Sequence, residues 1–159
     1  MNNHTILTLA VGAIIVESIG LILIYFTALT RKTIRQWYKQ FTLGAYAMDI
    51  ISVLIGTYLA TLFTPNFYLQ LLYVAIIGVI HDTSFGFFIN SINTKSSKIL
   101  EFFKKYAKEY GKQILFVDAL ILVSTLLVSN YLVITFSQNN IYFIGILFIY
   151  IGLLFVYSF

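Results

Sequence analysis

All ten basic residues of the chain fall in two short windows separated by long apolar stretches. The first window contains Arg31, Lys32, Arg35 and Lys39, and the second contains Lys95, Lys98, Lys104, Lys105, Lys108 and Lys112. Hydrophobic residues make up 60% of the 159 positions, and the mean hydropathy is +0.90. A soluble domain of this length cannot bury so much apolar surface, whereas lipid can accommodate it. The pattern predicts a single-domain, all-α membrane protein.

Five apolar stretches are long enough to be membrane-spanning helices, since roughly 20 apolar residues cross about 30 Å of hydrocarbon. These predicted spans are residues 5–30, 42–63, 67–92, 113–136 and 141–159. The sequence therefore predicts a polytopic transmembrane helix bundle with five spans.

The connections between the spans alternate in charge. Links 31–41 and 93–112 contain every Lys and Arg, whereas residues 1–4, 64–66 and 137–140 contain none. Because basic loops stay in the cytoplasm, the N-terminus is expected outside and both basic links inside. With an odd number of spans, the C-terminus is also expected inside.

The second basic window has the periodicity of an amphipathic helix over about 97–111. Ile99, Phe103, Tyr106 and Tyr110 recur on one face, and the lysines occupy the other. This pattern predicts a cytoplasmic interfacial helix whose aromatic rings enter the acyl boundary of the inner leaflet.

The first window repeats this pattern on a smaller scale around Trp37. The membrane-surface residues predicted from both windows are Arg31, Lys32, Arg35, Trp37, Lys39, Lys98, Phe103, Lys104, Lys105, Tyr106 and Lys108. The net charge of +4 comes from these windows, so it favours a bilayer with an anionic inner leaflet over nucleic acid. A docking surface for a partner is the alternative, and the pattern is also compatible with a homo-oligomer.

Five ionisable residues interrupt the apolar stretches at overlapping depths. They are Glu17, Asp49, His81, Asp82 and Asp118, and no Lys or Arg lies in the same stretches. A charged carboxylate that faces lipid is costly, so we expect these side chains to face the bundle interior. They are candidates for holding protons, for binding a cation, or for lining a hydrated cavity. The alternative is that each is a hydrogen-bonded strut between helices.

Several chemistries are excluded because the chain lacks the residues that they require. The chain has no cysteine, so it has no thiolate metal site and no covalently attached haem. No lysine lies in a predicted span, which excludes a retinal Schiff base, and the GxSxG, HExxH and phosphate-loop motifs are absent. We therefore predict no catalytic residue, and a bound cation is the one candidate cofactor, of unknown identity.

Four segments resemble a family of small polytopic membrane proteins of large DNA viruses of algae and protists. They are GAYAMDI (44–50), IHDTSFGFF (80–88), EFFKKYAKEYG (101–111) and VDALILVSTLL (117–127). The family pattern is matched by Asp49, His81, Asp82, Phe85, Tyr106, Glu109 and Asp118. The resemblance covers about 44–130 and leaves the first and fifth spans, with Glu17, unmatched. It implies a viral or host internal membrane, for example the lipid layer beneath a capsid, and no particular activity.

Three functions are compatible with these observations. The first is a carrier or channel for protons or metal ions that uses the buried acids and His81. The second is a structural protein of a virion inner membrane, in which the acids are struts. The third, an intramembrane enzyme that modifies lipids or sterols, is less favoured because no catalytic motif supports it.

Overall fold

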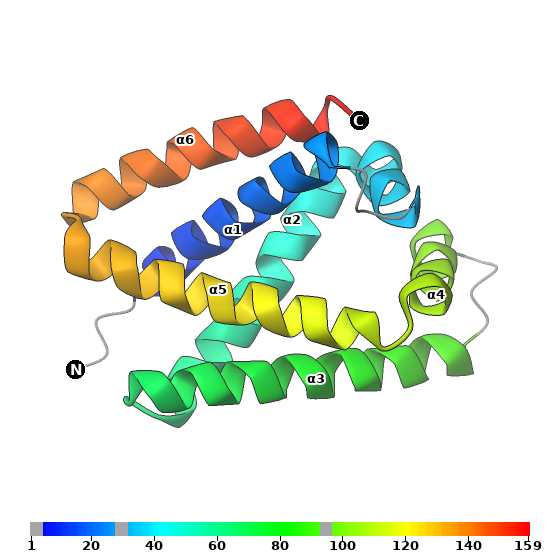
Figure 1. Cartoon of the computed structure of the whole chain (residues 1–159), viewed down its shortest axis with the longest axis horizontal. Helices are drawn as coiled ribbons and strands as arrows, with labels where there is room; N and C mark the ends of the chain where they lie inside the picture. The colour runs from blue at the N-terminus through cyan, green and yellow to red at the C-terminus, as the bar shows by residue number, and fades with distance from the viewer. Residues whose placement is uncertain (1–4, 28–31, 93–96) are drawn as a thin grey trace.

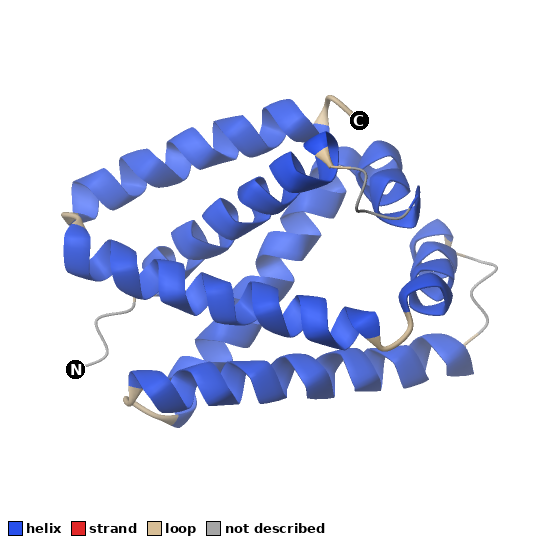
Figure 2. Ribbon diagram, viewed as in Figure 1, coloured by secondary structure: helices blue, strands red, loops and turns tan. Residues whose placement is uncertain are grey.

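The computed structural model describes residues 5–27, 32–92 and 97–159, which form six helices and no strand (Figures 1 and 2). The helices are α1 (Ile6–Phe26), α2 (Lys32–Phe63), α3 (Phe67–Ser91), α4 (Lys98–Tyr110), α5 (Gln113–Thr135) and α6 (Gln138–Val156). All except α4 are long and apolar enough to cross a membrane. The predictions of an all-helical chain and of five candidate spans are thus confirmed.

Local residue chemistry explains where several helices begin and end. The Thr5 side chain accepts a hydrogen bond from the backbone of α1, and the Asn66 side chain accepts two from the first turn of α3. Pro65 lies in the turn before α3, where it removes no helical hydrogen bond. Ser97 caps α4, and Gly111, at φ 54°, ends it in a conformation that glycine adopts readily.

Helix α2 is broken at Thr42, whose backbone has φ 44° and ψ −122°. This conformation is rare and strained for a β-branched residue. It divides α2 into a first segment, 32–41, and an apolar segment, 43–63. The break lies at the boundary between the basic link and the second predicted span.

The described residues of both basic windows lie at one end of the bundle (Figure 1). The start of α2, helix α4 and the C-terminal residues lie together at this end, which we call the basic end. The start of α1, the α2–α3 turn and the α5–α6 turn lie at the opposite end. Helix α1 contacts α2, α5 and α6, while α3 packs on α2 and α5.

Glycine residues allow the helices to approach closely. A methyl group on Gly56 or Gly78 would come within 2.9 or 2.7 Å of the Leu122 side chain of α5. On α1, a methyl group on Gly12 would meet the Ser129 hydroxyl, also from α5. These contacts bring α1, α2 and α3 against the same helix, as expected for membrane helices that associate through small residues.

Candidate functional site

Four helices bring the four acids of the apolar stretches together towards the basic end. They are Glu17 of α1, Asp49 of α2, Asp82 of α3 and Asp118 of α5, and we call them the acid cluster. Asp118 lies close enough to Asp82 for the two carboxyls to interact directly, and Asp49 acts on it as well. Glu17 interacts electrostatically with Asp49 and Asp118. The four acids therefore form a series of electrostatic neighbours, although they are up to 101 residues apart in the sequence (118 − 17).

Asp49 joins the two segments of α2. Its Oδ2 atom accepts hydrogen bonds from Trp37 Nε1, at 3.0 Å, and from the Tyr38 hydroxyl, at 2.8 Å. Trp37 and Tyr38 are buried, at 4% and 3% exposure. These two bonds hold the first segment of α2 against the apolar segment across the break at Thr42.

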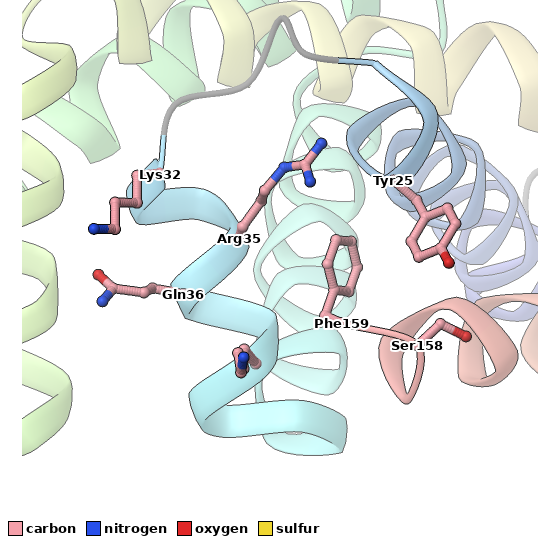
Figure 3. Close-up of a pocket in the computed structure, with 7 residues that line it drawn as sticks. Tyr25, Lys32, Arg35, Gln36, Ser158 and Phe159 are labelled. Atoms are coloured by element: carbon pink, nitrogen blue, oxygen red, sulfur yellow. The ribbon is translucent and has the colours of Figure 1, made fainter.

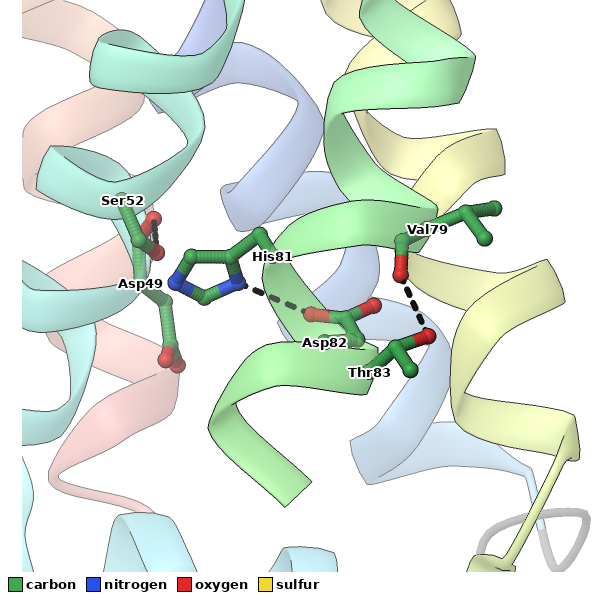
Figure 4. Close-up of polar contacts among 6 residues, drawn as sticks. All are labelled: Asp49, Ser52, Val79, His81, Asp82 and Thr83. Atoms are coloured by element: carbon green, nitrogen blue, oxygen red, sulfur yellow. Dashed lines mark hydrogen bonds and ion pairs between the residues drawn. The ribbon is translucent and has the colours of Figure 1, made fainter. Parts of the chain in front are cut away.

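Asp82 is paired with its neighbour His81. The Nδ1 atom of His81 lies 3.0 Å from Asp82 Oδ1, while the other oxygen, Oδ2, is buried without a hydrogen-bond partner in the described part of the chain. The His81 side chain is 63% exposed, whereas that of Asp82 is 11% exposed (Figure 4). His81 thus lies at the rim of the acid cluster and Asp82 lies inside it.

Glu17 is the most buried member of the cluster, at 7% exposure. It interacts with the phenol of Tyr46, whose oxygen lies 2.8 Å from Ser18 Oγ. Gly152 of α6 faces this hydroxyl pair and leaves no room for a larger side chain. A buried polar contact between α1 and α2, covered by α6, therefore lies beside Glu17.

Helix α4 lies against the cluster through Tyr106. The Tyr106 phenol interacts with Asp118, Asp49 and Asp82. Burial raises the pKa of Tyr106 above its ordinary value, and the negative charge of Asp118 raises it further. A neutral phenol, which can donate a hydrogen bond, is therefore maintained beside the carboxyls at neutral pH.

The aromatic rings of both basic windows pack against protein, and the expectation that the apolar face of α4 also enters lipid stays a prediction. Trp37 stacks on Phe102 at 4.9 Å between ring centroids and lies 5.1 Å from Phe103. Phe103 also contacts Phe85 of α3 at 5.1 Å, and Tyr106 stacks on Phe102 at 6.2 Å. The reason is that α4 contacts α2, α3 and α5, so its apolar face meets theirs.

The predicted basic residues remain at the surface. Lys32, Arg35, Lys39, Lys98, Lys104, Lys105 and Lys108 are exposed, and Arg31 lies outside the described residues. Among the described residues the ion pairs are His81–Asp82 and Lys105–Glu101, the latter at 3.2 Å. No described Lys or Arg therefore neutralises the acid cluster.

The described residues contain no group of three or more His, Asp or Glu side chains placed to hold a metal ion. The acids meet in a chain of pairwise contacts instead. Two hydroxyls near the acids donate to backbone carbonyls of their own helices (Figure 4). Ser52 donates to the Asp49 carbonyl at 2.9 Å, and Thr83 donates to the Val79 carbonyl at 2.7 Å.

The sequence did not reveal which phenol and indole groups lie beside the acids. Trp37 and Tyr38 contact Asp49 across the helix break at Thr42, and Tyr46 contacts the neighbour of Glu17 from another helix. No spacing in the sequence indicates such contacts. Tyr106 lies on the expected apolar face of α4, but the periodicity does not show that the face covers acids.

Comparison with known proteins identifies no relative: no family model, curated protein or solved structure matches the chain.

Proposed function

We propose that the chain is an integral membrane protein that carries protons across the bilayer through the acid cluster, with its basic end in the cytoplasm. The five apolar helices and the gathering of the described Lys and Arg side chains at one end support membrane insertion in this orientation.

The observation that carries the proposal is that carboxyls from four helices lie within electrostatic range of one another without a described Lys or Arg partner. Asp82 and Asp118 interact electrostatically, and two charged carboxylates repel each other strongly in a poorly solvated site, so we propose that this pair holds a proton. A proton requires no shell of several ligands, so it suits a site in which carboxyls meet in pairs. Intramembrane acids of this kind are characteristic of proton relays.

Four buried residues with hydroxyl groups lie on the far side of the acid cluster from the basic end. Thr8, Thr57, Thr125 and Ser129 are each at most 2% exposed and lie in the half of the bundle away from the basic end. Ser129 of α5 donates to the backbone carbonyl of Thr8 at 3.4 Å, which links two of these helices. Together with Glu17, these groups mark the route that we propose for protons.

Proton flux in liposomes tests the proposal. The purified chain would be reconstituted with a pH-sensitive dye inside the vesicles, and a potassium gradient with valinomycin would supply the driving force. Asp82→Asn and Asp118→Asn should each lower the flux by about tenfold or more, because an amide cannot release a proton. Glu101→Gln is the matched control, since Glu101 is an exposed acid of α4, and its flux should equal that of wild type.

A structural role in a membrane is the second candidate, and the hydrogen bonds of Asp49 to Trp37 and Tyr38 favour it. It would be supported if wild type carries no proton flux and Asp82→Asn lowers the free energy of unfolding by more than about 2 kcal/mol. A lipid-modifying enzyme has no such support, because the two surface grooves at the basic end are not lined by any member of the acid cluster.

A viral or host internal membrane is the location we propose from the motif resemblance alone. Immunogold labelling of infected cells would test it, and labelling confined to the plasma membrane of uninfected cells would contradict it.

A further inference from the structure

We propose that a groove at the basic end binds the phosphate headgroup of one anionic glycerophospholipid of the cytoplasmic leaflet. The groove lies where the end of α1, the first segment of α2 and the residues after α6 meet (Figure 3). It has a volume of about 460 Å³. This volume lies within the range of roughly 300–1,000 Å³ that is common for ligand pockets. The site is separate from the acid cluster and does not depend on proton transport.

Three cationic side chains line one wall of the groove. Lys32, Arg35 and Lys39 recur at i, i+3 and i+7, so they share one face of the first segment of α2. Arg35 Nη2 donates to the backbone carbonyls of Ile24, at 2.9 Å, and Thr27, at 2.8 Å. These bonds fix the guanidinium at the C-terminal end of α1. The residues that line the groove include no Asp or Glu, so the wall is complementary to an anion.

Aromatic side chains form the opposite wall. Phe159 lies between Arg35 and Tyr25 in Figure 3, and its ring centroid is 5.8 Å from that of Tyr25 and 5.7 Å from that of Tyr38. Tyr25 is in the last turn of α1, which is the level at which aromatic residues meet the headgroup region of a bilayer. A groove with a cationic wall and an aromatic wall at this depth matches a phospholipid, whose phosphate is joined to an apolar tail.

Native mass spectrometry of the full chain, released from mixed micelles of phosphatidylglycerol and phosphatidylcholine, tests the proposal. Wild type should retain one phosphatidylglycerol in preference to phosphatidylcholine. The double variant Lys32→Gln/Lys39→Gln should lose about tenfold of this preference, as expected when two lysines are removed from an anionic surface. Lys104→Gln/Lys108→Gln is the matched control, because it removes the same charge from the exposed face of α4 and should keep the preference.

Two results would overturn the proposal. An equal loss of preference in both double variants would show that attraction to the overall positive charge, and not the groove, selects the lipid. Displacement of the bound lipid by millimolar inorganic phosphate would show a site for free phosphate. Circular dichroism of each variant would establish that it folds, and all four substituted lysines are exposed, so folding is expected to be retained.

Discussion

The hydrogen bond between Tyr38 and Asp49 should be a measurable part of the stability of the bundle. Tyr38→Phe removes the hydroxyl that lies 2.8 Å from Asp49 Oδ2 and changes little else, because the ring keeps its position at 5.7 Å from Phe159. A hydrogen bond to a charged group contributes about 1.5–3 kcal/mol, and one between neutral groups about 0.5–1.5 kcal/mol. The substitution should therefore lower the free energy of unfolding by about 0.5–3 kcal/mol, with the upper half of this range expected if Asp49 is ionised.

The single tryptophan of the chain provides the assay, because Trp37 donates to the same carboxyl oxygen at 3.0 Å and is buried against Phe102. Its fluorescence would be followed while sodium dodecyl sulfate unfolds the protein in mixed micelles. A double-mutant cycle of Tyr38→Phe with Asp49→Ala isolates the coupling between the two side chains, because alanine has no atom that accepts the Tyr38 hydroxyl. A coupling above about 1.5 kcal/mol would indicate that Asp49 is ionised, and a smaller one that it is neutral.

The control for this cycle is Tyr150→Phe, because Tyr150 is 62% exposed on α6. Its free energy of unfolding should stay within about 0.5 kcal/mol of wild type. If Tyr38→Phe and Asp49→Ala are additive within about 0.3–0.5 kcal/mol, the two side chains are not coupled. The assignment of Asp49 as the connection between the two segments of α2 would then be wrong.

Three further predictions concern packing, strain and orientation. Gly12→Ala should lower the free energy of unfolding by about 1–3 kcal/mol because the added methyl meets α5. Gly20→Ala, whose added methyl meets nothing within 4 Å, should raise it by up to about 1 kcal/mol. Equal effects of the two substitutions in denaturant titrations would contradict the tight α1–α5 contact. Thr42→Gly should raise the same free energy by about 1 kcal/mol because glycine relieves the strain at φ 44°, and a clear loss would contradict that strain. The chain has no native cysteine, so single introduced cysteines can report the orientation. A cysteine at Asn139 should react with an impermeant maleimide from outside intact cells, and one at Lys104 only after permeabilisation. The reverse result would invert the proposed orientation.

The helical architecture was predictable because its signals are local. Each span is a long apolar run, and the turns have their own residues, such as Pro65 between the second and third spans and Gly111 after α4. The convergence of the acids was also an expected consequence of burial, since an acid in an apolar helix avoids lipid. These inferences need only the composition of each segment.

The contacts around Asp49 were not predictable for a physical reason. They depend on the reversal at Thr42, where the backbone adopts a positive φ that threonine rarely takes. No turn-forming residue marks the break, so nothing in the sequence shows that Trp37 and Tyr38 fold back onto a residue 11 or 12 positions later. The bonds themselves stabilise a strained conformation that the local sequence does not favour.

The protein contacts of α4 were not predictable because amphipathic periodicity identifies an apolar face without identifying what covers it. Phe103 and Tyr106 have the spacing of residues that enter lipid, yet they pack against Trp37, Phe85 and Phe102. A lipid tail and an aromatic side chain are equally apolar partners for such a face. Only the three-dimensional arrangement of α2 and α3 distinguishes them.

Infrared spectroscopy of the protein in lipid nanodiscs would test most directly whether the acid cluster exchanges protons. A protonated carboxyl has a carbonyl stretching band that an ionised carboxylate lacks, and the band shifts when the proton is exchanged for a deuteron. We predict such a band in wild type at neutral pH, a rapid shift in D₂O, and a clear loss of its intensity in Asp82→Asn and Asp118→Asn. If wild type has no such band, or if the band does not shift in D₂O, the carboxyls do not exchange protons and the proposed function is contradicted.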